Sequence, residues 1–255
     1  MSRQYQRIGE RISAEIAQGD LTTGDRLPTE REYAERFGVS RTVVREAFIM
    51  LELAGRVNVR KGSGTYVCDP NSAALTNPAP AGDAPDSEDI GPFELLNARQ
   101  VVESAIAACA AELITKPEIR RLQQLLDDER RGLTDVARGR SQHVEADAAD
   151  RAFHLGIAEA TQNTLLYEMA TRLWDQRRRS PMWQHLHARI LDFSYRNDWL
   201  ADHDAILRQL RKRDSQAAQQ AMWIHLENVK TTLFALSDTD DPRFDGYLYQ
   251  QARAR

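Results

Sequence analysis

Four side chains in the C-terminal part of the chain have the chemistry of metal ligands: Asp150, His154, His203 and His225. Asp150 and His154 are four residues apart, so on a helix they lie on one face and can point at a common centre. Three imidazoles and one carboxylate suit zinc or a neighbouring transition metal, with positions left for water or an anion. Spacing alone leaves a second interpretation open, in which Asp150 and His154 form a capping or surface pair and the other histidines are structural.

A single arginine, Arg99, has the chemistry to hold a small carboxylate. Its guanidinium offers two parallel donors, a geometry that lysine cannot reproduce. The same spacing also allows an ion pair with Glu103, one helical turn further on. From the residues alone, both interpretations stand.

Basic and hydroxyl side chains in the N-terminal part could contact nucleic acid. Arg41, Thr42 and Arg45 fall in the first turns of a predicted helix, where side chains of these types can meet base edges. Arg31 and Lys61 could hold phosphates or reach the minor groove. A solvated basic face that mediates protein contacts is the competing interpretation.

The elements that carry these residues follow from capping signals and periodicity. Apolar residues spaced at three and four positions predict a first helix that Gly19 closes: Tyr5, Ile8, Ile12 and Ile16. Thr29 and Glu32 form a capping box for a second helix, and Ser40 caps a third that runs to about Ala54. Two helices joined by a short turn are typical of a helix-turn-helix.

A short hairpin is predicted directly after the third helix. Residues Val57–Arg60 alternate as a strand does, Lys61–Gly64 has turn composition, and Thr65–Val67 alternates again. A hairpin in this place is a wing, so the N-terminal part is expected to be a winged helix-turn-helix.

The segment GDRLPTEREYAERFGVSRTVVREAFIMLELAGRVNVRKGSGTYV closely resembles the winged-helix domain of the GntR superfamily of bacterial transcription regulators. Val43 and Ser63 depart from the family, where many members have proline and a basic residue. In the FadR-like branch of that superfamily, the resemblance implies DNA contacts at Arg31, Ser40, Arg41, Thr42, Arg45, Lys61 and Gly62.

The rest of the chain has helical periodicity and no convincing strand, which predicts an all-α helical bundle. Between the two parts, residues 69–92 contain five of the nine prolines, five acidic residues and no basic or aromatic residue, and predict a flexible linker. The expected domains are 1–68, the linker 69–92, an effector- and metal-binding, dimerising domain 93–240, and a tail 241–255. Helices are expected to begin at Pro92, after Thr115 and at Ser141, and to span about 164–179, 182–195, 197–212 and 214–236.

This helical part resembles the ligand-binding FCD domain of the FadR-like branch. Metal-binding members use the pattern DxxxH, then His, then His on the final helix, which implies a metal at Asp150, His154, His203 and His225. Zinc is the expected metal, with nickel or manganese as alternatives. The family pattern ARxxxE implies an effector-binding role for Arg99.

Segments such as FELLNARQ, PMWQHLH and SYRNDWLADH are similar to those of the regulators of hexuronate utilisation. This resemblance implies a homodimeric repressor that binds a palindromic operator and is released by a hexuronate or its keto-acid isomer. A different small acid such as lactate remains open. So does a metal-dependent helical phosphohydrolase built on the pair His203-Asp204, although the winged helix would then be unexplained. The favoured interpretation is a regulator and not an enzyme.

Composition fits a folded protein of two domains. The chain has 255 residues, 42% of them hydrophobic, and a net charge of −4, which neither requires nor excludes a nucleic-acid partner. The N-terminus lacks the apolar core of a secretory signal, no apolar run reaches membrane-spanning length, and two cysteines cannot form a disulfide framework. A cytoplasmic location without membrane attachment is therefore expected.

Overall fold

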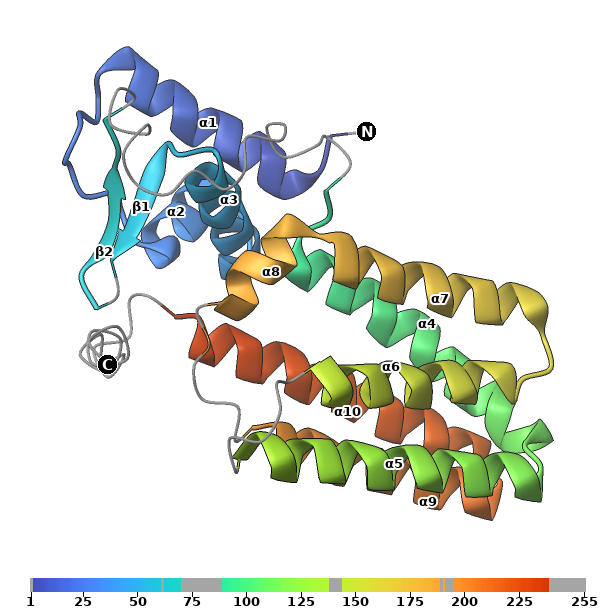
Figure 1. Cartoon of the computed structure of the whole chain (residues 1–255). Coiled ribbons are helices and arrows are strands. Elements are labelled where there is room, and N and C mark those ends of the chain that lie inside the picture. The colour runs from blue at the N-terminus through green and yellow to red at the C-terminus, as the bar shows by residue number, and fades with distance from the viewer. Residues whose placement is uncertain are drawn as a thin grey trace. The chain divides into compact units, whose positions relative to one another are not determined.

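The structure is a computed structural model, and it describes residues 2–60, 62–69, 89–137, 144–188, 190 and 195–238. These residues form ten helices and one two-stranded sheet, which confirms the mainly α fold class (Figure 1). They divide into two compact units. Unit 1 takes the described residues up to Phe93, those from Ser180 to Ile190 and those from Phe234 onward, and unit 2 takes the remainder.

The first three helices of unit 1 form the predicted helix-turn-helix: α1 (Gln4–Gln18), α2 (Glu30–Phe37) and α3 (Arg41–Leu53). The Thr29 hydroxyl accepts from the Glu32 amide, and the Glu32 carboxylate accepts from the Thr29 amide at 2.7 Å. Gly38 ends α2 with a φ of 65°, a conformation that favours glycine. The Ser40 side chain accepts from the Val43 amide and so fixes where α3 begins.

The wing consists of β1 (Val57–Arg60) and β2 (Gly64–Val67), which pair antiparallel with Val57 opposite Val67. Both valines are buried, and they extend an apolar core contributed by α1, α2 and α3. Side chains that are essentially buried in that core include Ile12, Tyr33, Val44, Ala47 and Ile49. Local capping therefore sets the ends of the helices, while this shared core holds α3 in place.

One predicted helix is shorter in the structure. The expected helix 182–195 is α8 (Pro181–Ala188), which packs on α3 within unit 1. The Ile190 amide bonds to the His187 carbonyl in a turn, so the α-helical ladder does not continue. Tyr195 instead precedes the next helix, because its carbonyl accepts from the amides of Asp198 and Trp199. Apolar residues continue past Ala188 in the sequence, and this pattern predicts a longer helix than the structure has.

Unit 2 is a helical bundle whose helices run roughly lengthwise beside one another (Figure 1). Helix α5 packs against α6 and α9, and α6 packs against α7. The helix ends agree closely with the expected starts and spans, apart from the start at Ser141, which lies outside the described residues. The helices are α4 (Pro92–Leu113), α5 (Lys116–Ala137), α6 (Val144–Glu159), α7 (Thr164–Arg179), α9 (Arg196–Lys212) and α10 (Ser215–Leu236).

Most of the predicted linker and the whole predicted tail 241–255 lie outside the described residues, so the domain division stays a prediction. Within the part of the chain that the structure describes, no helix combines the length and the apolar character needed to cross a membrane.

Candidate functional site

Three histidines from three helices of unit 2 meet at one buried point. The Nε2 atom of His203 on α9 lies 3.2 Å from that of His154 on α6 and 3.2 Å from that of His225 on α10. Asp150, one turn before His154, places Oδ1 3.5 Å from the His154 Nε2 and 3.7 Å from the His203 Nε2. All four side chains are buried. The structure therefore brings together the four residues that the sequence proposed as ligands.

A carboxylate stands behind each imidazole, on the side away from the meeting point. Glu103 on α4 lies 2.5 Å from the Nδ1 of His154, and Glu129 on α5 lies 3.0 Å from the Nδ1 of His203. Asp202 lies 3.5 Å from the Nδ1 of His225, an ion-pair distance rather than a hydrogen bond. An ionised carboxylate can only accept, so each carboxylate favours the tautomer with its proton on Nδ1.

In this tautomer, the neutral imidazoles direct no proton at the meeting point. When the Nδ1 atoms carry the protons, the Nε2 lone pairs of His154 and His225 each face that of His203 at 3.2 Å. Lone pairs this close repel unless a cation lies between them. Neutral imidazoles with outward carboxylate partners are the usual environment of a protein-bound metal ion. The residues present therefore fit a metal ion.

Electrostatics act differently on the members of the cluster. Burial lowers the pKa of His154, whereas at His203 burial is outweighed by Glu129 and Asp150, which raise the pKa of that imidazole. Burial acts to raise the pKa of Glu103, but Arg99 and His154 outweigh it and lower this pKa to about 2. Burial and the neighbouring His203 lower the pKa of His225 to about 3. The lone pair of His225 is therefore available near neutral pH, as metal ligation requires.

Sequence reasoning missed the outer carboxylates. Glu129 also belongs to a second group of potential ligand atoms, with Asp150 and His203, that lie within 4.8 Å of one another. Glu129 stands in the acidic run DDER, and Glu103 was considered only as the partner of Arg99. Neither has a spacing that marks it, because its relation to a histidine is made by packing between helices.

Arg99 is buried beside this cluster and holds the ion pair that the spacing allowed. Its Nε donates to Glu103 at 2.6 Å, and its guanidinium lies 4.0 Å from the centre of the Trp174 ring. Glu103 therefore accepts hydrogen bonds from both Arg99 and His154. The ion pair and a position next to the histidine cluster occur together, so the two interpretations of Arg99 are not exclusive.

A second buried arginine, which no sequence pattern singles out, approaches the cluster from α7. Arg177 Nη1 lies 3.3 Å from Asp150 Oδ2, and its guanidinium lies 4.8 Å from the Trp174 ring centre. The Trp174 Nε1–H is buried and has no hydrogen-bond partner among the described residues. Arg177 stands in a run of three arginines at a helix end, which from sequence resembles ordinary helix-dipole stabilisation.

The alternative pair for a phosphohydrolase does not form. Asp204 lies next to His203 in sequence, but its carboxylate pairs with Arg130 at 3.0 Å in a partly exposed position. Asp204 does not belong to either group of potential ligand atoms found in the described residues.

The candidate DNA-contacting residues lie on the helix-turn-helix and the wing of unit 1. Ser40 is exposed and bonds to the Thr42 hydroxyl at 2.8 Å, and Arg31 is exposed and paired with Glu35 at 2.9 Å. Gly62 has a φ of 67° in the turn of the wing, a conformation that favours glycine. Lys61 lies outside the described residues.

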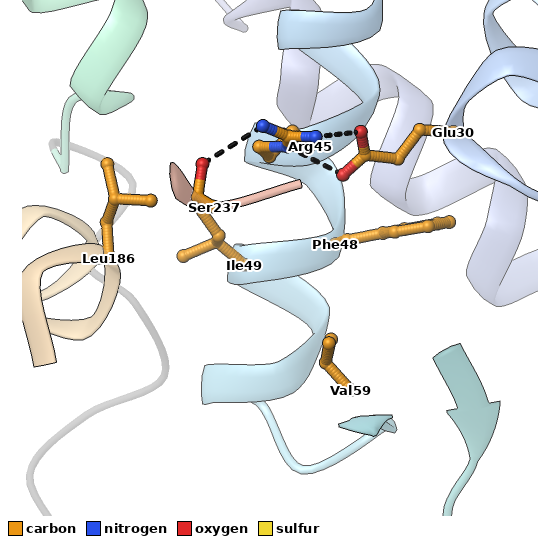
Figure 2. A pocket seen from close by; sticks show the side chains of 7 residues that line it. All are labelled: Glu30, Arg45, Phe48, Ile49, Val59, Leu186 and Ser237. Carbon is orange, nitrogen blue, oxygen red and sulfur yellow. Dashed lines mark hydrogen bonds and ion pairs between the residues drawn. The ribbon is translucent and has the colours of Figure 1, made fainter. Parts of the chain in front are cut away.

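Two arginines of α3 are less available than their positions suggested. Arg45 is only 2% exposed, and its Nε and Nη2 atoms form a bidentate ion pair with Glu30 on α2 (Figure 2). Arg41 is partly exposed and pairs with Asp238 at 2.9 Å. A side-chain pattern cannot reveal this burial, because it depends on which segments pack over the start of α3.

The chain combines a winged helix-turn-helix with a helical unit that encloses a buried cluster of potential metal-ligand side chains. This combination defines the class of ligand-responsive DNA-binding regulators. Two family descriptions match the chain: "Bacterial regulatory proteins, gntR family" over residues 4–67 and "FCD domain" over residues 94–228. The chain belongs to the gntR family of bacterial regulatory proteins and carries an FCD domain.

Relatives of known role resemble the chain over almost its whole length. A Uxu operon regulator of Haemophilus influenzae is 47% identical, with 98% of this chain and 89% of the relative covered. The Uxu operon transcriptional regulator of Escherichia coli K12 is 48% identical, with 97% and 93% covered. The Exu regulon transcriptional regulator of the same strain is 41% identical, with 98% and 92% covered. These relatives are regulators and not enzymes.

Proposed function

We propose that this protein is a cytoplasmic, homodimeric repressor of hexuronate catabolism genes that a small sugar acid releases from DNA. The observation that carries the proposal is the similarity, at 47% and 48% identity over nearly the full chain, to two Uxu operon regulators. The resemblance of its helical segments to regulators of hexuronate utilisation points the same way. The domains would be 1–68 for DNA, 69–92 as linker, 93–240 for effector, metal and dimerisation, and 241–255 as tail.

DNA contact is assigned to the first turns of α3, its flanking turn and the wing. A twofold dimer places two such helices on a palindromic operator, so the symmetry of the site mirrors that of the protein. The proposed contact residues are Arg31, Ser40, Arg41, Thr42, Arg45, Lys61 and Gly62.

The metal is assigned to His154, His203, His225 and Asp150, with zinc as the first candidate and nickel or manganese as alternatives. When bound, the ion would supply a Lewis-acidic centre for the oxygen atoms of a small acid. Glu103 and Glu129 orient the imidazoles that face it. Arg99 would pair with the carboxylate of the effector.

Glu103→Gln is expected to lower metal affinity about 10- to 100-fold, the usual cost of losing an outer carboxylate behind a ligating histidine. The amide can no longer accept from Arg99 and His154 with a full negative charge. Competition titration with a chromogenic chelator measures the affinity. Glu159→Gln, an exposed residue of α6 that pairs with Arg121, is the matched control and should bind metal as the wild type does. Equal affinities for Glu103→Gln and the wild type would contradict the assignment.

A different small carboxylate, such as lactate, is the second candidate effector. A metal ion with one arginine recognises the carboxylate and adjacent oxygen that these acids share, so the site chemistry does not separate them. Long acyl chains fit poorly, since hydrocarbon would leave buried polar groups unpaired.

The proposed function is tested by fluorescence anisotropy with a palindromic DNA site from the hexuronate genes of the same organism. Glucuronate, galacturonate, fructuronate and tagaturonate are added separately at fixed salt, because phosphate contacts make the affinity salt-dependent. One of these acids is expected to weaken binding about 5- to 150-fold, the range of ordinary allosteric coupling. Tight binding without any response would reject the hexuronate assignment, and absence of specific binding would reject the repressor.

A further inference from the structure

The two arginines at the start of α3 are held by the chain's own C-terminal end of α10. We call residues Phe234–Asp238 the α10 terminus; they belong to unit 1, as α3 does. The Asp238 carboxylate bridges both arginines, with Oδ2 2.9 Å from Arg41 Nη2 and Oδ1 3.4 Å from Arg45 Nη2. A single carboxylate therefore occupies two guanidinium groups of the helix assigned to DNA reading.

The remaining donor of Arg45 is also taken by the α10 terminus. Its Nη1 donates to the Phe234 carbonyl and, at 3.0 Å, to the Ser237 hydroxyl. Figure 2 shows Ser237 and Glu30 on opposite sides of the Arg45 guanidinium. The Phe234 ring lies 3.9 Å from the Arg45 guanidinium carbon and 5.0 Å from that of Arg41. Glu30 thus neutralises Arg45 from within the helix-turn-helix, while the α10 terminus covers its other edge.

The contact satisfies the donors of the Arg41 guanidinium only in part. Arg41 Nε is buried and has no hydrogen-bond partner among the described residues. Asp238 satisfies one edge of the Arg41 guanidinium, whereas a phosphate could accept from Nε and Nη2 together. A cavity of about 10 Å³, room for about one water molecule, lies beside Arg45 and Ser237 (Figure 2). The α10 terminus therefore satisfies the hydrogen-bond donors of these arginines less completely than a DNA phosphate could.

We propose that the α10 terminus is an autoinhibitory contact, in which Asp238, Ser237 and the Phe234 carbonyl compete with DNA phosphates for Arg41 and Arg45. The inference rests on the proposed DNA-binding role of α3. Operator affinity is then reduced by the fraction of molecules in which the contact is closed. Helix α10 also carries His225. The same helix thus supplies a proposed metal ligand and leads directly into the segment that contacts Arg41 and Arg45. A change at the metal ligand can therefore be passed along this helix to the contact.

Asp238→Asn is expected to tighten operator binding about 2- to 5-fold, the range for one partly exposed ion pair. Anisotropy at fixed salt measures the dissociation constant. Asp20→Asn is the matched control: it removes the same charge from an exposed residue of unit 1 and should change affinity much less. Tighter operator binding by Asp238→Asn alone supports the autoinhibitory contact. An equal gain in operator affinity in both variants would contradict it, because the gain would then come from the change in net charge. Wild-type protein that binds no operator would instead refute the underlying function.

Hydrogen exchange gives a second, independent readout on the wild-type protein. Operator DNA is expected to speed amide exchange in residues 235–238, because the α10 terminus must leave Arg41 and Arg45, while it slows exchange at the start of α3. Slower or unchanged exchange at residues 235–238 in the DNA complex would overturn the proposal even if Asp238→Asn behaves as expected.

Discussion

His203→Ala is expected to abolish stoichiometric metal binding. The Nε2 atom of His203 lies 3.2 Å from both other imidazole Nε2 atoms, so its loss removes the central ligand. The loss of affinity should exceed the about 10- to 100-fold that removal of an outer carboxylate costs. Metal content after dialysis and competition titration with a chelator measure the effect.

A histidine elsewhere provides the control for that experiment. His185 lies in unit 1, with its Nε2 2.8 Å from Glu52, and His185→Ala should retain the wild-type metal content. His203→Ala with full metal content and unchanged affinity would remove the histidine cluster from the proposed function. Because metal binding stabilises the folded state over the unfolded one, chelation of the wild type should also lower its melting temperature.

Arg45→Ala is expected to destabilise the protein by about 3–5 kcal/mol, the cost of leaving one member of a buried ion pair without its partner. Glu30 and Arg45 are each 2% exposed, so the carboxylate cannot regain water without opening the packing of α2 against α3, and it would keep the longer contact with Arg41 Nη2 at 3.7 Å. Arg41→Ala, at a partly exposed pair, should change stability by at most about 1 kcal/mol but still weaken operator binding. Urea unfolding and anisotropy on both variants separate the two effects.

A double substitution checks the reason for that loss. Arg45→Met combined with Glu30→Gln leaves no unpaired buried charge and should recover part of the lost stability. A wild-type unfolding midpoint for Arg45→Ala, or no recovery in the double variant, would show that the buried ion pair does not carry this energy.

Local signals predicted the helix-turn-helix and wing closely because the determinants are local. The Thr29–Glu32 box, the Ser40 cap and the turn at Gly38 each involve residues a few positions apart. Apolar periodicity likewise gave most helices of unit 2. It failed at α8, where a turn at Ile190 interrupts a pattern that continues beyond it.

Residue spacing predicted the site only to the level of single helix faces, and the family resemblance supplied His203 and His225. The spacing of Asp150 and His154 indicated a common direction, but spacing cannot say what lies behind an imidazole. Glu103 and Glu129 reach their histidines across helix interfaces, and Arg45 is buried by a segment far away in sequence. Such relations depend on tertiary packing, which a one-dimensional pattern does not contain.

Glu103 accepts hydrogen bonds from both Arg99 and His154, and this shared carboxylate couples binding of the proposed effector to binding of the proposed metal. An acid that draws Arg99 away leaves Glu103 with His154 as its main donor, and a less shared carboxylate makes that imidazole a more basic ligand. Effector should therefore raise the affinity for metal, and by reciprocity metal should raise the affinity for effector by the same factor. Metal and effector would then bind with positive heterotropic cooperativity. A low concentration of metal would weaken the response of DNA binding to the effector, and a low concentration of effector would weaken metal binding.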